Sequence, residues 1–235
     1  MELLNKTEAL EGLLLRLAER HPQREFLDKQ LYRASGGKRG EGRLKARFKE
    51  FWIEEAFTAL WDISLTLGDW PVQIDGLLLT ERCAVVIESK NISDEIHFDE
   101  ATGEFFRIAP DGNKTTLEDP RVQLAKHVRF LERWFRLQKI PLPVTGLSVF
   151  TAKQCEFASK PRGAPICKAY QMPDYLLNIW QSYPPTLRAP NSRKSASCFS
   201  AIKPLLDGTP FANATQSMPP TSKPASCAAN AAHLP

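Results

Sequence analysis

This chain of 235 residues lacks the features that mark membrane and secreted proteins. No apolar run approaches the roughly 20 residues that a membrane-spanning helix needs, which excludes helical spans. Residues 1–6 carry early charge and no signal-peptide layout. The cysteines are odd in number and scattered, unlike a disulfide framework or a zinc site: Cys83, Cys155, Cys167, Cys198 and Cys227. We therefore expect a cytoplasmic protein with reduced thiols and no membrane association.

Several sequence signatures of enzymes are absent too. The chain has no Gly-rich phosphate loop, no zinc-ligand pattern and no nucleophile elbow, which argues against P-loop, zinc-finger and α/β-hydrolase classes. Hydrophobic residues make up 43% and charged residues 25%, as in ordinary globular proteins. The length allows one sizeable domain with appendages.

The most informative residues present are charged groups in apolar surroundings. Residues 72–79 and 83–90 read as two buried strands, and Asp75, Glu88 and Lys90 lie at their ends. Charged side chains are rarely buried without a partner. A divalent metal ion shared by the two carboxylates is the simplest partner.

The geometry of a hairpin supports this interpretation. If the two strands turn around Glu81 and Arg82, Leu78 faces Val85 and Asp75 faces Glu88. Directly opposed residues have Cβ atoms about 4.5–5.5 Å apart, so both carboxylates could reach one cation. Lys90 is two residues beyond Glu88 and points to the same face.

A hard cation such as Mg²⁺ or Mn²⁺ prefers carboxylate oxygens and keeps several waters. Asp75 and Glu88 would supply two ligands, and Lys90 would orient the attacking water. The alternative is structural: an ion pair between Glu88 and Lys90 at a sheet edge, with Asp75 at an exposed strand start.

Three further polar residues are Glu41, Gln123 and His127. Glu41 could add an outer ligand to the metal, or could only complement the dipole of its helix. Gln123 and His127 share a helix face at i, i+4, and Gln123 could hold the water or a phosphate oxygen. For His127 we favour a partly buried polar residue without a chemical role.

Basic residues are concentrated between Arg33 and Lys49, with only Glu41 as a counter-charge. A patch of this kind attracts polyanions, although a solvated helix face is the common alternative. The residues proposed to bind nucleic acid are Lys38, Arg39, Arg43, Lys45, Arg47 and Lys49.

Periodicity and turn residues predict an α/β protein. Helices are expected over residues 2–20, 23–33, 40–52, 120–138 and 172–181, with Gly36 and Gly37 breaking the second from the third. Besides the central pair, strands are expected over residues 57–67 and 144–150, with residues 154–158 pairing to the latter. Residues 92–99 and 104–108 read as a polar hairpin. Both faces of the central strands are apolar, so helices should cover the sheet on both sides.

The C-terminal part differs in composition. Nine of the eighteen prolines fall between Pro184 and Pro235. A short helix over residues 197–206 is conceivable, and disorder is expected from Thr209 onward.

Five separated motifs together resemble the nuclease-related domain (NERD) family, which is placed with the PD-(D/E)XK nuclease superfamily. They are, in order, Gly37-Lys38-Arg39-Gly40-Glu41, Trp61-Asp62-Ile63-Ser64-Leu65, Gln73-Ile74-Asp75-Gly76-Leu77-Leu78-Leu79, Val86-Ile87-Glu88-Ser89-Lys90-Asn91-Ile92, and Asp119-Pro120-Arg121-Val122-Gln123 with His127. One departure is Asp94, where the family often has glycine.

The resemblance implies a restriction-endonuclease-like mixed β-sheet flanked by helices. It also implies metal and catalytic roles for Asp75, Glu88 and Lys90, supported by Gln123 and Glu41. The expected organisation is a helical N-terminal extension (1–35), the nuclease-related domain (36–140), a strand and helix extension of the core (141–183) and a largely disordered tail (184–235). The expected function is Mg²⁺- or Mn²⁺-dependent hydrolysis of DNA phosphodiester bonds. The alternative is a catalytically inactive module of the same fold that binds nucleic acid or a partner.

Overall fold

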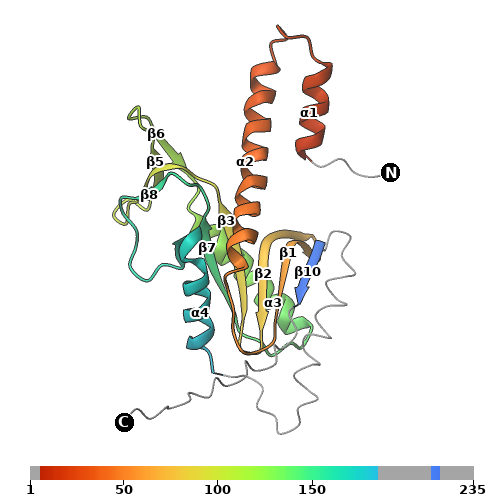
Figure 1. The fold of residues 1–235 in the computed structure, drawn as a ribbon, viewed down its shortest axis with the longest axis vertical. Coiled ribbons are helices and arrows are strands. Elements are labelled where there is room, and N and C mark those ends of the chain that lie inside the picture. Colours follow the sequence, from red (N-terminus) through yellow and green to blue (C-terminus); the bar gives the residue numbers. More distant parts are fainter. Residues whose placement is uncertain (1–5, 185–212, 218–235) are drawn as a thin grey trace, which may run out of the picture.

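A mixed β-sheet forms the centre of the computed structural model, which describes residues 6–184 and 213–217 (Figure 1). Its strand order is β10-β1-β2-β3-β7-β9. The bounds are β1 (Phe57–Leu67), β2 (Trp70–Thr80), β3 (Ala84–Lys90), β7 (Val144–Phe150), β9 (Ile166–Lys168) and β10 (Asn213–Ser217). Strands β1, β2 and β3 are antiparallel, whereas β7 runs parallel to β3. The predicted register is confirmed, because Leu78 pairs with Val85.

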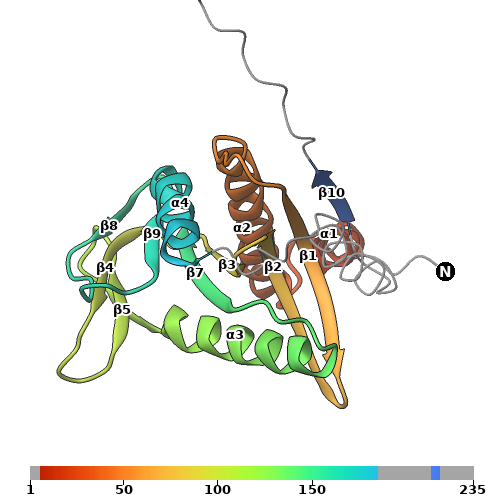
Figure 2. The ribbon, with the colours of Figure 1, turned by 90° about the horizontal axis from the view of Figure 1, so that it is seen from below.

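Helices cover both faces of this sheet, as the two-sided apolar pattern predicted (Figure 2). On one face, α3 (Pro120–Leu137) buries Phe130 and Leu131 against β1, β2 and β3. On the other, α2 (Arg24–Phe48) and α4 (Met172–Ser182) pack around Trp61. The α/β fold with a mixed sheet flanked by helices is therefore confirmed.

A second, smaller sheet lies beside the first and has the order β6-β5-β4-β8. Its strands are β4 (Asp94–Phe98), β5 (Phe105–Ile108), β6 (Lys114–Leu117) and β8 (Cys155–Phe157). The predicted pairing of residues 154–158 with 144–150 is wrong, because β8 runs parallel to β4. Phe157, in strand β8 of the second sheet, packs its ring on Phe150 of β7 in the first sheet, with ring centroids 5.0 Å apart.

The predicted break at Gly36 and Gly37 is also wrong, because α2 continues through both glycines. Glycine in a helix costs only about 1 kcal/mol relative to alanine, which packing can offset. Here the packing is close at Gly40, where an added Cβ would lie 2.8 Å from the Thr151 Oγ1. Gly40 thus lets α2 lie directly against the end of β3.

The N-terminal half of α2 extends beyond the sheet and pairs with α1 (Lys6–Arg16) (Figure 1). Leu10 and Leu14 are the buried residues of α1. The Arg24 guanidinium donates to the carbonyls of Leu14 and Leu17, at 3.2 and 3.0 Å. It therefore satisfies carbonyl groups that the end of α1 leaves without helical partners.

One strand falls within the segment that was expected to be disordered from Thr209. This strand is β10, which pairs antiparallel with β1 through Thr58 and Ser217. The helix considered for residues 197–206 lies outside the described residues. No helix within residues 6–184 is both long and apolar enough to cross a membrane.

Candidate active site

Asp75 lies where regular pairing of the central sheet stops. The β2–β3 ladder ends at Gly76 and Ile87, and the β1–β2 ladder omits the position of Asp62 and Asp75. Asp62 has a positive φ of 54°, which is uncommon outside glycine. Beyond the last ladder pair, the Ser89 N–H donates to the Asp75 Oδ2 over 2.8 Å. The sheet therefore opens at this point, and a carboxylate takes the place of a backbone acceptor.

Glu88 is buried between β3 and α3, with 1% of its surface exposed. The Gln123 Nε2 donates to its Oε2 over 3.1 Å, and the His127 Nδ1 contacts its Oε1. An ionised carboxylate only accepts hydrogen bonds, so Nδ1 is the protonated ring nitrogen when Glu88 is ionised. Both oxygens of Glu88 are therefore oriented by α3.

Lys90 joins the same network. Its ammonium donates to the Gln123 Oε1, so four side chains form one chain in the order Lys90, Gln123, Glu88, His127. Asp119 caps the N-terminus of α3, because its Oδ1 accepts from the Arg121 N–H over 2.8 Å. Because residues at i and i+4 share a helix face, Gln123 and His127 both reach β3.

Asp75 is buried in surroundings with an excess of negative charge, and both effects raise the pKa of its carboxyl group. Burial, followed by the charge of Glu88, raises the pKa of Asp75 from 3.8 to about 7. The charge of Glu41 also contributes to this rise, whereas the Ser89 N–H and Lys90 oppose it. The network thus contains more negative charge than Lys90 neutralises.

Glu41 reaches this region from α2. Burial, followed by the charge of Asp62, raises the pKa of Glu41, and Lys45 and Lys38 lower it. The structure therefore brings the predicted supporting carboxylate within electrostatic range of Asp75, together with two of the predicted basic residues.

The residues present fit a hard cation that keeps much of its own water. Asp75 and Glu88 offer carboxylate oxygens, and the Asp75 Oδ1 has no hydrogen-bond partner within residues 6–184. No three His, Cys, Asp or Glu side chains of the described parts converge into a full metal-binding group. Such a donor set suits Mg²⁺ or Mn²⁺ with water ligands rather than a structural zinc site.

The predicted nucleic-acid-binding residues divide into two rows along α2. One row holds the lysines, namely Lys38, Lys45 and Lys49, the last directly after α2. The charges of Lys38 and Lys45 act on Glu41. Arginines form the other row, namely Arg39, Arg43 and Arg47. Arg43 donates to the Asn91 Oδ1 and the Thr151 carbonyl, both at 3.0 Å, and Arg47 pairs with Glu50 at 2.7 Å. Of these six residues, Lys38 and Lys45 are the two whose charges lower the pKa of Glu41.

Comparison with known proteins identifies a family for the central part of the chain. Residues 36–151 match the family model of the nuclease-related domain. Residues 36–151 are a nuclease-related domain. No curated protein and no solved structure matches the chain. The nuclease-related domain extends through β7, whose Ser148 lies beside Glu88 in the parallel register.

His127 has a buried contact at the candidate site that sequence reasoning did not predict. It is buried against Glu88, whereas we expected a polar residue without a chemical role. Its spacing of four residues from Gln123 was the available signal. Ser148 was missed as well, and its buried hydroxyl has no hydrogen-bond partner among the described residues.

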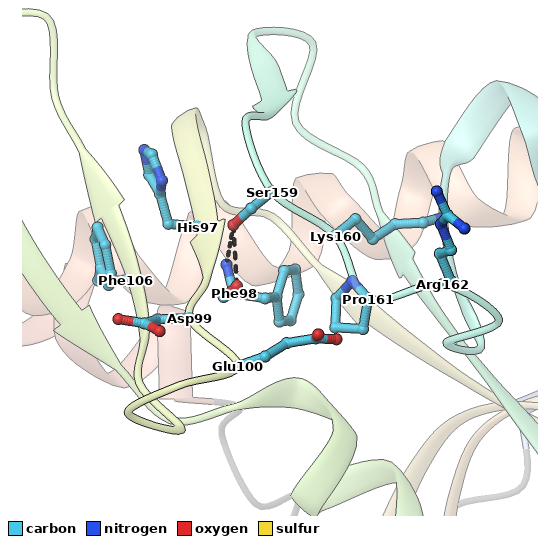
Figure 3. A pocket seen from close by; sticks show the side chains of 9 residues that line it. All are labelled: His97, Phe98, Asp99, Glu100, Phe106, Ser159, Lys160, Pro161 and Arg162. Atoms are coloured by element: carbon cyan, nitrogen blue, oxygen red, sulfur yellow. Dashed lines mark hydrogen bonds between the residues drawn. The ribbon is translucent and has the colours of Figure 1, made fainter.

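A hollow of about 690 Å³ on the second sheet is separate from the nuclease-related site (Figure 3). It contains a histidine and a serine, but they do not form a catalytic pair. The Ser159 hydroxyl bonds to the backbone of Phe98 in both directions, and His97 stacks on Phe106 with centroids 4.8 Å apart. Neither side chain is positioned to activate the other.

Proposed function

We propose that this protein is a metal-dependent nuclease that hydrolyses DNA phosphodiester bonds. The observation that carries the proposal is the juxtaposition of Asp75 and Glu88 beside Lys90, with the pKa of Asp75 raised to about 7. Two carboxylates at the open end of a sheet hold Mg²⁺ or Mn²⁺. When bound, such an ion polarises a phosphoryl oxygen and acidifies water.

The remaining side chains position the reacting groups. Lys90, held by Gln123, orients the attacking water and offsets negative charge on the phosphate. His127 and Gln123 fix the two oxygens of Glu88, and the hydrogen bond from Ser89 fixes Asp75. Glu41 supports the site by adding negative charge near Asp75.

The substrate is recognised through its backbone. Lys38 and Lys45 lie near Glu41, and together with Lys49 in the same row of α2 they contact phosphates. Contacts between lysine and phosphate carry no sequence information, so we expect weak sequence preference. Binding should weaken as salt increases.

Cleavage of plasmid and single-stranded DNA with Mg²⁺ and with Mn²⁺ tests the proposal. The wild type is compared with Asp75→Ala and Lys90→Ala, and with Asp69→Ala and Lys126→Ala as exposed controls of the same residue types. We expect the site variants to lose cleavage by at least ~100-fold and the controls to retain it. Equal cleavage by all five proteins contradicts the assignment.

One observation favours an alternative, a catalytically inactive module that binds nucleic acid. Both oxygens of Glu88 already have protein partners, which a purely structural role would also require. DNA binding that depends on salt but never leads to metal-dependent turnover supports this alternative.

A further inference from the structure

A groove of about 1250 Å³ runs between the N-terminal half of α2 and the second sheet. Its walls come from α2, the segment after β3, strand β5 and the segment before β8. It lies on the arginine flank of α2, away from the lysine row. Most of its contributors play no part in the chemistry described above.

The groove is strongly cationic, since six basic and two acidic residues line it. Arg43 donates only to neutral oxygens, so its charge is not balanced. Arg33 and Lys153 are exposed and have no hydrogen-bond or ion-pair partner within residues 6–184. Two of the basic residues are paired, because Arg107 bonds to Asp94 at 3.3 Å and Lys29 to Glu25 at 2.6 Å. Such a surface selects an extended polyanion.

An aromatic ring lies in the same groove. Tyr32 is 74% exposed, although large aromatic side chains usually bury much of their surface. The Arg39 guanidinium is 5.7 Å from its ring centroid. Cationic grooves with exposed aromatic rings are the surfaces on which proteins stack unpaired bases while holding the phosphates.

The groove meets the candidate active site at one residue. Asn91 lines the groove and directly follows Lys90, so their Cα atoms are about 3.8 Å apart. Its side chain donates to the Gly36 carbonyl over 2.8 Å and accepts from Arg43. At the end of β3, Lys90 therefore contacts α3 at the candidate site, and Asn91 contacts α2 in the groove.

We propose that this groove binds a single nucleic-acid strand that continues from the active site. Arg33, Arg43 and Lys153 contact its phosphates, and Tyr32 stacks on a base. In a duplex the base faces are covered by their neighbours, so stacking on Tyr32 selects an unpaired strand. This inference rests on the proposed nuclease function and specifies the form of its substrate.

Fluorescence anisotropy in EDTA tests the inference, because binding is then measured without cleavage. The probes are a labelled oligodeoxynucleotide and its duplex. The groove variants are Arg33→Ala/Lys153→Ala and Tyr32→Ala, and Arg129→Ala/Arg133→Ala on exposed positions of α3 is the control with the same charge change.

We expect tighter binding of the single strand than of the duplex by wild type. Each groove variant should weaken single-strand binding by about fivefold or more, and the charge variant should also lower the salt slope by about 1.4, whereas the control leaves both unchanged. Equal affinity for both probes, or equal effects of groove and control variants, overturns the inference. If the wild type binds the single strand in this groove but does not cleave DNA, that result would count against the nuclease proposal alone.

Discussion

The Ser89 N–H donates to the Asp75 Oδ2 over 2.8 Å, at the position where the β2–β3 ladder has ended. A side-chain oxygen thus extends the strand pairing by one step and fixes Asp75 opposite Glu88. The two carboxylates are held together by the backbone rather than by their own interaction, which is repulsive.

The first prediction concerns stability against pH without divalent metal. The folded-state pKa of Asp75 is about 7, against an ordinary value of 3.8, so the folded protein keeps a proton that the unfolded chain loses. The free energy of unfolding should therefore fall as pH rises from about 4 to about 7, and then level off. The ceiling of this effect is about 4 kcal/mol, which solvent screening of a half-buried carboxylate reduces.

Urea unfolding in EDTA between pH 5 and pH 8 measures this dependence. Asp75→Asn should flatten the fall, because the amide does not titrate, whereas Asp69→Asn in the exposed turn should not. A wild type whose stability is constant or rises over this range contradicts the raised pKa.

The second prediction concerns the contact of α2 with the end of β3. A Cβ at Gly40 would lie 2.8 Å from the Thr151 Oγ1, whereas one at Gly42 would meet nothing within 4 Å. Gly40→Ala should cost about 1–3 kcal/mol of stability through overpacking. Gly42→Ala should stabilise by about 0.5–1 kcal/mol, because alanine favours the helix. Urea midpoints of the two variants check this, and equal shifts would exclude the close packing.

The third prediction concerns His127. His127→Ala leaves the buried Glu88 carboxylate without one of its two partners, which should cost about 3–5 kcal/mol. His97→Ala, on the second sheet, is the control and should cost under about 1 kcal/mol, because its partner Glu95 stays solvated. Thermal unfolding measures both. A His127→Ala variant as stable as the control contradicts the buried contact.

The fourth prediction separates the two basic rows. Lys38→Ala/Lys45→Ala should weaken duplex DNA binding. The double variant should also lower the salt slope by about 1.8, which corresponds to the loss of two phosphate contacts. Arg47→Ala should have little effect, because Arg47 already pairs with Glu50. Anisotropy at several salt concentrations measures the slopes, and a larger loss for Arg47→Ala would place the DNA on the other flank.

Local patterns were enough to predict the centre of the fold. The register of β2 with β3 follows from a turn between two apolar runs, and Leu78 opposite Val85 confirms it. The helix expected from residue 120 begins there, since Asp119 caps α3 and Pro120 suits its first position.

Tertiary packing decided what the sequence could not show. The sequence predicted a break at Gly36 and Gly37, but α2 runs through both. Just beyond them, Gly40 lies against Thr151, which is more than 100 residues away in the chain. Strand β8 has three residues, too few to display a period, and its parallel partner β4 is distant in the chain. The contact of His127 with Glu88 depends on the packing of α3 against β3, and the two residues are 39 positions apart in the sequence.

Isothermal titration of the metal-free protein with Mn²⁺ tests the central claim most directly. Our account predicts saturable binding of one ion by the wild type and by Asp69→Asn. It predicts at least tenfold weaker binding by Asp75→Asn and Glu88→Gln, since each loses one charged ligand. Mn²⁺ binding that is unchanged in both site variants, or absent from the wild type, would contradict a metal site formed by these two carboxylates.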